Sequence, residues 1–156
     1  MQYKKIVVTE KSILRNKEFD RREELLKELS SLLLNQEFVK GNFYEELVKR
    51  ENEFPTGLNM GSFGVAIPHT DPGVVIKDSI AVAVLENPVQ FGEMTNPENK
   101  VNAKVVFLLA LTDSTKHLKV LQKIIKIIQD SNLLKSLFIK DEYEMSNFLN
   151  SYLNAI

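Results

Sequence analysis

The chain contains two histidines, His69 and His117, and no cysteine, so any nucleophilic chemistry must use non-thiol groups. His69 follows a short predicted strand over 64–67, and Pro68 fixes its own φ while holding the preceding residue in an extended conformation. The segment 70–73 (Thr-Asp-Pro-Gly) then turns the chain. The imidazole is therefore expected on a rigid turn at a sheet edge, where functional groups of α/β proteins often lie. The alternative is a tight turn that carries an incidental histidine.

His117 is the third residue after Ser114, which can cap a helix. The first turn of a helix presents unpaired N–H groups and a partial positive charge. It therefore favours a nearby phosphate and disfavours a positively charged imidazolium, and the position of His117 indicates phosphate chemistry. The alternative is a half-exposed helical residue without a role.

Other chemistries lack their sequence signatures. The chain has no Walker A loop, no dinucleotide-binding glycine fingerprint and no His-Glu-x-x-His segment. His69, His117 and Asp71 are metal-ligating types without ligand spacing, and Ser62, His69 and Asp71 lack the nucleophile-elbow sequence of a hydrolase. We therefore predict neither a metal nor a cofactor.

The composition limits which classes of partner and which cellular compartment we expect for this chain. The 20 Lys and Arg residues balance 21 Asp and Glu residues, which argues against a nucleic-acid partner. The apolar runs are too short for an export signal or a spanning helix, so membrane insertion is not expected. The absence of cysteine agrees with a reducing compartment, and we expect a cytoplasmic protein.

The apolar pattern alternates between strands and helices. Runs rich in β-branched residues predict strands over 4–9, 64–67, 79–85 and 104–111. Capping residues followed by apolar stripes predict helices from Asp20 through Leu33, from Asn42 to Glu51, from Ser114 to Ile128, over 131–138 and from Asp141 to Leu153. The segment 86–101 has no apolar period and is predicted to be a surface loop. The pattern predicts an α/β fold, a single domain over 1–156 with a mixed β-sheet flanked by helices on both faces.

The helix predicted from Ser114 carries two distinct stripes. Its expected core face consists of Leu118, Leu121, Ile124, Ile125 and Ile128. Beside it runs a basic ridge of Lys116, Lys119, Lys123 and Lys126. This ridge is interpreted either as a docking surface for an acidic partner or as a solvated face.

Four segments resemble a known family. They are Arg50-Glu51, Pro55-Thr56-Gly57, Gly64-Val65-Ala66-Ile67-Pro68-His69 and His117-Leu118. In this order they resemble the enzyme IIA components of the bacterial phosphoenolpyruvate-dependent sugar phosphotransferase system, of the fructose–mannitol type. The resemblance implies that His69 accepts a phosphoryl group from the histidine-containing phosphocarrier protein and passes it to a sugar-specific enzyme IIB, which serves the membrane enzyme IIC. It also implies that Arg50 pairs with the phosphate and that His117 is the second active-site histidine.

The chemistry is consistent with these residue types. A neutral imidazole can attack phosphorus, and transfer then depends on in-line positioning and on cationic groups such as the planar fork of Arg50. The segment from Arg50 to Gly57 resembles the galactitol branch most, although that branch does not reliably carry a histidine at the position of His117. Nitrogen-regulatory relatives share the fold and the phosphorylation segment, so the alternative function is a regulatory module that binds and controls other proteins.

Overall fold

The computed structural model describes residues 5–155, and its central layer is a mixed β-sheet. Within these residues the strand order is β1-β4-β5-β3-β2. The strands are β1 (Ile13–Leu14), β4 (Ser79–Gly92), β5 (Lys100–Ala110), β3 (Gly64–Ala66) and β2 (Gly57–Asn59). β1 runs parallel to β4 and β3 parallel to β5, whereas the β4–β5 and β2–β3 pairs are antiparallel. The predicted mixed sheet is confirmed.

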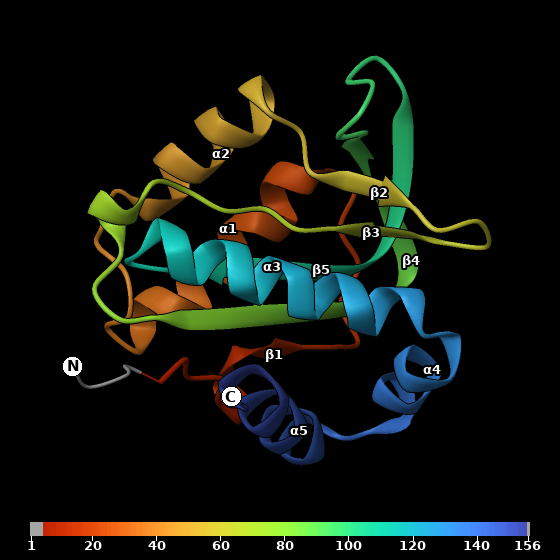
Figure 1. Cartoon of the computed structure of the whole chain (residues 1–156). Coiled ribbons are helices and arrows are strands. Elements are labelled where there is room, and N and C mark those ends of the chain that lie inside the picture. The colour runs from red at the N-terminus through yellow and green to blue at the C-terminus, as the bar shows by residue number, and fades with distance from the viewer. Residues whose placement is uncertain (1–4, 156) are drawn as a thin grey trace.

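Helices cover both faces of this sheet (Figure 1). On one face lie α1 (Arg22–Asn35) and α2 (Phe43–Glu53), and on the other lie α3 (Ser114–Gln129), α4 (Ser131–Ile139) and α5 (Glu142–Asn154). Short 3-10 turns, η1 (Glu10–Ser12) and η2 (Pro72–Val74), complete the element order. The predicted α/β architecture with helices on both faces is therefore confirmed.

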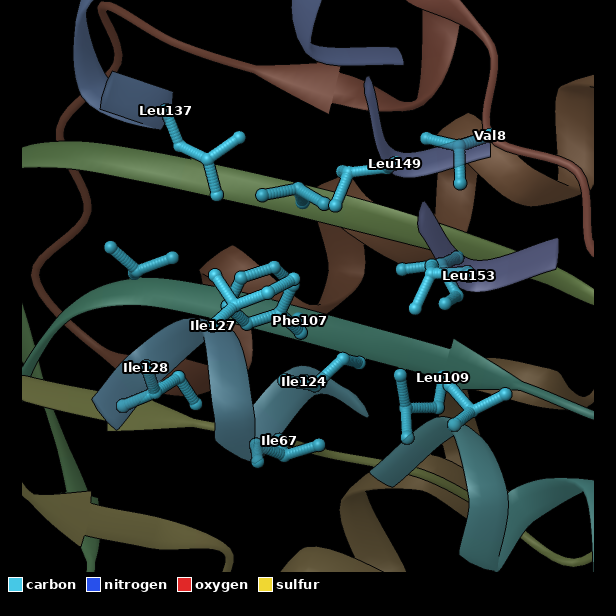
Figure 2. Packing of buried hydrophobic residues seen from close by; sticks show 14 of the residues in the cluster. Val8, Ile67, Phe107, Leu109, Ile124, Ile127, Ile128, Leu137, Leu149 and Leu153 are labelled. Atoms are coloured by element: carbon cyan, nitrogen blue, oxygen red, sulfur yellow. The ribbon is translucent and has the colours of Figure 1, made fainter. Parts of the chain in front are cut away.

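The alternation of side chains along β5 divides the core into two clusters. Phe107 and Leu109 point to the α3 side, while Val106 and Leu108 point to the α1 and α2 side. This burial on both faces explains why the sequence of β5 is almost continuously apolar. Figure 2 shows the α3 side, where Ile124 and Ile127 pack over Phe107.

The buried face of α3 differs from the predicted one. Its buried residues are Val120, Ile124, Ile127 and Ile128, whereas Leu118 is 56% exposed. The apolar residues of α3 spread over about half of its circumference, which is wide enough for two overlapping stripes. The sheet contacts the stripe centred on Ile124 and leaves Leu118 beside His117 at the surface.

The strand predicted over 4–9 is wrong for its described part; residue 4 lies outside the described residues. Val7 forms only an isolated bridge with Ser79. Instead, the Val8 N–H donates to Asn150 Oδ1 at 2.8 Å, and Asn150 Nδ2 donates to the Val8 carbonyl oxygen at 2.6 Å. The main chain of Ile6 pairs with the side-chain amide of Asn154 in the same way. Side chains of α5 thus take the place of a neighbouring strand.

The surface loop predicted over 86–101 is also wrong. β4 extends to Gly92 and β5 begins at Lys100, so most of this segment belongs to a long hairpin. The pairing register shifts between Val84 and Val89, and Pro88, which has no N–H to donate, falls in this irregular stretch. The proline and asparagine residues therefore mark a break in the ladder and not the end of the strand.

Two predicted helix caps are replaced by neighbouring residues. α1 begins at Arg22 with Arg21 in the cap position and no side-chain cap, so Asp20 does not serve as one. α3 is capped by Asp113, whose carboxylate accepts from the Thr115 N–H at 2.7 Å, and Ser114 is the first helical residue. Among residues 5–155 we find no helix with the length and apolar character that crossing a membrane requires.

Asn150→Ala should lower the free energy of unfolding by about 1–3 kcal/mol, because it leaves the buried main-chain groups of Val8 without partners. Urea unfolding at constant pH measures the loss. Asn147→Ala, at an exposed position of the same helix, is the matched control. Equal losses in the two variants would contradict this account of the N-terminal segment.

Candidate active site

His69 lies just beyond the end of β3, still paired with β5. The Leu109 N–H donates to the Pro68 carbonyl oxygen at 2.9 Å, and His69 bridges to Leu109. Its ring nitrogen Nδ1 lies 3.0 Å from the carbonyl oxygen of Ile67. Because a carbonyl oxygen can only accept, Nδ1 must carry the hydrogen, which leaves the lone pair on Nε2. The local fold therefore selects the tautomer in which Nε2 is the nucleophilic atom.

His117 reaches the same place from the neighbouring strand. β5 ends at Ala110 and α3 begins at Ser114, so His117 stands in the first turns of a helix beside the end of β3. The two imidazole rings lie 4.4 Å apart between centroids and are tilted by 57°. The backbone N–H of His117 donates to the Asp113 carbonyl at 3.0 Å, so it is not one of the free amides of the helix end.

A buried ion pair fixes the start of α3. Asp78 is 3% exposed, and its carboxylate accepts from the Thr112 N–H at 2.7 Å, the Thr112 hydroxyl at 2.9 Å and Lys116 Nζ at 2.7 Å. Burial acts to raise the pKa of Asp78, but the hydrogen bonds from Lys116 and Thr112 outweigh it and the pKa lies below its usual value. This clamp ties the connection between β5 and α3 to the beginning of β4.

The basic ridge on α3 is largely used inside the molecule. Lys116 belongs to the Asp78 clamp, and Lys123 donates to main-chain carbonyls at the end of α5, including those of Tyr152 and Leu153. Only Lys119 and Lys126 of the four are exposed. Neither interpretation of the ridge, a docking surface or a solvated face, therefore applies to all four lysines, because a buried carboxylate and helix-terminal carbonyls hold Lys116 and Lys123.

Arg50 approaches the histidines from the last turn of α2. Its Nη1 lies 3.6 Å from Asp71 Oδ1, and its guanidinium carbon lies 4.7 Å from the centroid of the Phe54 ring. The Nε atom of Arg50 is buried and makes no hydrogen bond to any residue between 5 and 155. This N–H of the guanidinium therefore has no acceptor in the described part of the chain.

These three side chains meet at one small cavity. It has a volume of about 160 Å³ and is lined by Arg50, His69, Thr70, Asp71, Pro72, Leu111, Asp113, Ser114 and His117. Pockets for whole small molecules usually measure roughly 300–1,000 Å³. The cavity therefore suits a small transferred group better than a sugar. A larger cavity of about 460 Å³, between α3 and α5, has neither histidine in its lining.

Burial and positive charge keep both imidazoles neutral near pH 7. Burial is the main cause that lowers the pKa of His69, assisted by Arg50 and opposed by the hydrogen bond to Ile67. Burial, His69 and Arg50 together lower the pKa of His117 to about 4. A neutral imidazole retains the lone pair that nucleophilic attack requires.

The structure does not assemble the other sites that the residue types suggested. Ser62 lies in the turn before β3 begins, whereas His69 follows the end of that strand, so no Ser-His-Asp triad forms. In the part of the chain that the structure describes, no three His, Asp or Glu side chains gather as a metal site would require.

Sequence reasoning gave no role to Asp78 and treated Glu51 only as part of a motif. Glu51 is 1% exposed, and burial raises its pKa to about 7 even though its hydrogen bonds with Thr56 lower it. The spacing of Phe43, Leu47 and Glu51 places this carboxyl on the buried face of α2, which is a signal the sequence did contain. Asp78 carried no comparable signal.

The fold and the cavity define an α/β protein in which two histidines and an arginine meet beyond the carboxyl ends of β3 and β5. The family model described as "Phosphoenolpyruvate-dependent sugar phosphotransferase system, EIIA 2" matches residues 6–152. The chain belongs to this family, and the resemblance seen in its motifs is confirmed.

Individual relatives agree with this assignment. The galactitol-specific EIIA component of Escherichia coli strain K12 is 24% identical over 131 residues, or 84% of this chain and 87% of that protein. A complex of mannitol enzyme IIA with phosphorylated enzyme IIB from Escherichia coli matches with a TM-score of 0.68 at 18% identity, covering 97% of this chain and 99% of that chain. The nitrogen regulatory protein IIA-Ntr of Neisseria meningitidis matches with a TM-score of 0.70 at 23% identity, covering 95% and 97%.

Acid should destabilise the fold through His117. Between its ordinary pKa of 6.5 and its folded value of about 4, the unfolded chain binds a proton that the folded chain does not. The free energy of unfolding therefore falls as the pH falls through this range. His117→Gln removes this contribution, so the wild type should lose about 1 kcal/mol more than the variant between roughly pH 7 and pH 5, after allowance for partial solvent exposure.

Denaturant unfolding of both proteins at each pH measures this difference. Titrating groups that do not contact His117, such as Glu51, are common to the two proteins and cancel in the comparison. A pH dependence that is the same in both proteins would show that His117 titrates normally.

Proposed function

We propose that this chain carries a phosphoryl group on Nε2 of His69 as an intermediate in sugar phosphotransfer. The group comes from a histidine-containing phosphocarrier protein and goes to a sugar-specific enzyme IIB, which serves a membrane enzyme IIC. The observation that carries the proposal is the hydrogen bond from His69 Nδ1 to the Ile67 carbonyl, which leaves the Nε2 lone pair free beside Arg50.

Transfer of the phosphoryl group to His69 needs no general base. The Nε2 lone pair forms a bond to phosphorus while the bond between phosphorus and the donor nitrogen breaks, and that electron pair returns to the donor. Nε2 carries no hydrogen, so no proton must leave it. The His69 ring gains positive charge as the new bond forms, and its Nδ1–H then donates a stronger, charge-assisted hydrogen bond to the Ile67 carbonyl.

Arg50 and His117 supply the surrounding charge and donors. Arg50 lines the same cavity as His69, and its guanidinium offers a planar fork to the phosphoryl oxygens. His117 is neutral, so one of its ring nitrogens can donate to the same group while the other remains an acceptor. Neither residue needs to be phosphorylated itself.

The sugar we propose is galactitol or a related polyol. The galactitol-specific relative spans most of this chain, and the segment from Arg50 to Gly57 resembles that branch. The likeness to a nitrogen regulatory protein supports the second candidate, a module whose phosphorylated state controls another protein. Both functions need the same phosphohistidine, so onward transfer to an enzyme IIB separates them.

Incubation with phosphoenolpyruvate, enzyme I and the phosphocarrier protein should add one acid-labile phosphate to the wild type and none to His69→Ala. Addition of a galactitol-type enzyme IIB and its polyol should then remove the label from the wild type. Intact-protein mass spectrometry follows both steps. Undiminished labelling of His69→Ala would contradict the assignment, and label that stays on the chain with every enzyme IIB tried would favour the regulatory function.

Arg50→Ala should slow phosphorylation of His69 by about a hundredfold, because the variant loses the cation that stabilises the phosphoryl oxygens. Arg50→Lys should recover only part of the rate, since an ammonium cannot form the bidentate fork. Rapid-quench measurements give the rates. Lys49→Ala removes a neighbouring exposed cation as the matched control, and a rate in Arg50→Ala equal to that control would remove Arg50 from the site.

A further inference from the structure

A buried carboxylate lies directly behind the proposed phosphorylation site. Glu51 follows Arg50 in the last turns of α2 and is 1% exposed. It shares the buried face of this helix with Phe43 and Leu47. Removing a carboxylate from water is costly unless hydrogen bonds compensate for its lost hydration. A carboxylate at this buried position of α2 therefore suggests that Glu51 has a role beyond packing.

Both carboxylate oxygens of Glu51 contact one residue, Thr56. Oε2 accepts from the Thr56 N–H at 2.7 Å, and Oε1 accepts from the Thr56 hydroxyl at 2.8 Å. Thr56 is itself 2% exposed. Because the hydroxyl gives its single hydrogen to Glu51, towards any other donor it can only act as an acceptor. In its ionised form, which prevails above its raised pKa of about 7, the carboxylate thus fixes the direction in which the hydroxyl points.

That hydroxyl holds the strand end before His69. The N–H of Ile67 donates to Thr56 Oγ1 at 3.2 Å and to the Thr56 carbonyl at 3.3 Å. The carbonyl of the same residue, Ile67, accepts from His69 Nδ1 at 3.0 Å. A continuous chain of hydrogen bonds therefore runs from Glu51 through Thr56 and Ile67 to the imidazole.

We propose that Glu51 is a positioning residue for phosphoryl transfer. Through Thr56 it fixes the main chain of Ile67, whose carbonyl holds His69 with its hydrogen on Nδ1 and Nε2 free. This inference rests on the proposed function of His69. Because Glu51 is the immediate neighbour of Arg50 on α2, the same contact fixes the helix that carries the phosphate-binding cation relative to the strand that carries the nucleophile.

A purely structural role predicts a different outcome. If Glu51 only joined α2 to the β2–β3 hairpin, its loss would lower stability and leave the ring of His69 unchanged. Buried ionic groups can often be replaced by apolar residues without loss of stability, so packing alone gives little reason for a carboxylate here. The positioning role instead predicts a change in the tautomer of His69.

Glu51→Gln is the first test variant. Its amide oxygen can accept from one Thr56 donor, but its NH₂ group then faces the other donor and disrupts the hydrogen-bond chain. We expect nitrogen-15 NMR to show His69 changing from the Nδ1–H form to a mixture of tautomers. We expect the saturating rate of phosphorylation to fall about tenfold or more, while the KM for the phosphocarrier stays within about twofold. Glu45→Gln, at an exposed position of the same helix, is the matched control.

Thr56 supplies a second pair of variants that does not alter the carboxylate. Thr56→Ser keeps the hydroxyl and should retain the tautomer and rate of the wild type, whereas Thr56→Val keeps the shape and should behave like Glu51→Gln. This pair decides the matter if Glu51→Gln does not fold. An unchanged tautomer or an unchanged saturating rate in Thr56→Val, compared with Thr56→Ser, would overturn the proposal. So would a rise in KM alone.

The tautomer measurement needs no phosphoryl donor. A wild-type chain that accepts no phosphate would therefore contradict the proposed function and leave the NMR comparison in force. In that case an unchanged His69 tautomer in Thr56→Val overturns the positioning role, and a shifted tautomer supports it.

Discussion

The parallel pairing of β3 with β5 is the constraint on which the site depends. Val65 pairs with Val105 and Ala66 with Val106, so the carboxyl ends of the two strands lie side by side. Gly64 permits this approach, because a Cβ there would collide with Val101 and lie 2.6 Å from the Asn102 carbonyl oxygen. One strand leads into His69 and the other into the helix that carries His117. The sheet thereby brings the two imidazole rings into contact although they are 48 positions apart in the sequence.

Electrostatics and geometry act together in this arrangement. Two imidazoles in contact beside a guanidinium would repel one another if they were protonated, and burial adds to the cost of charging them. Arg50, the cation that helps to lower the pKa of both histidines, also attracts an anion such as the phosphoryl group that we propose. The site thus disfavours added protons and favours an anion.

The sequence could predict what depends on local pattern and could not predict what depends on distant contacts. Apolar periodicity predicted the mixed sheet and its flanking helices, and the Pro68 turn located His69 at a strand end. The strand predicted over 4–9 was wrong because Asn150 and Asn154, far along the chain, bind its main chain. The apolar pattern of α3 did not determine which side of the helix faces the sheet, and in the structure Ile124 is buried while Leu118 is exposed. Nothing near Asp78 in sequence shows that Lys116 is its partner.

Two buried carboxylates support the site from opposite sides. Asp78 ties the start of α3, and with it His117, to β4, while Glu51 ties α2 to the residues that precede His69. Each accepts hydrogen bonds from a main-chain N–H and a threonine hydroxyl, so each fixes backbone as well as side chain. A carrier must accept and release the same group with little energetic preference, so it gains from rigid positioning and not from tight binding of the phosphoryl group. Buried anchors outside the cavity meet this need, because they hold the nucleophile and the cation in place without adding contacts to the transferred group.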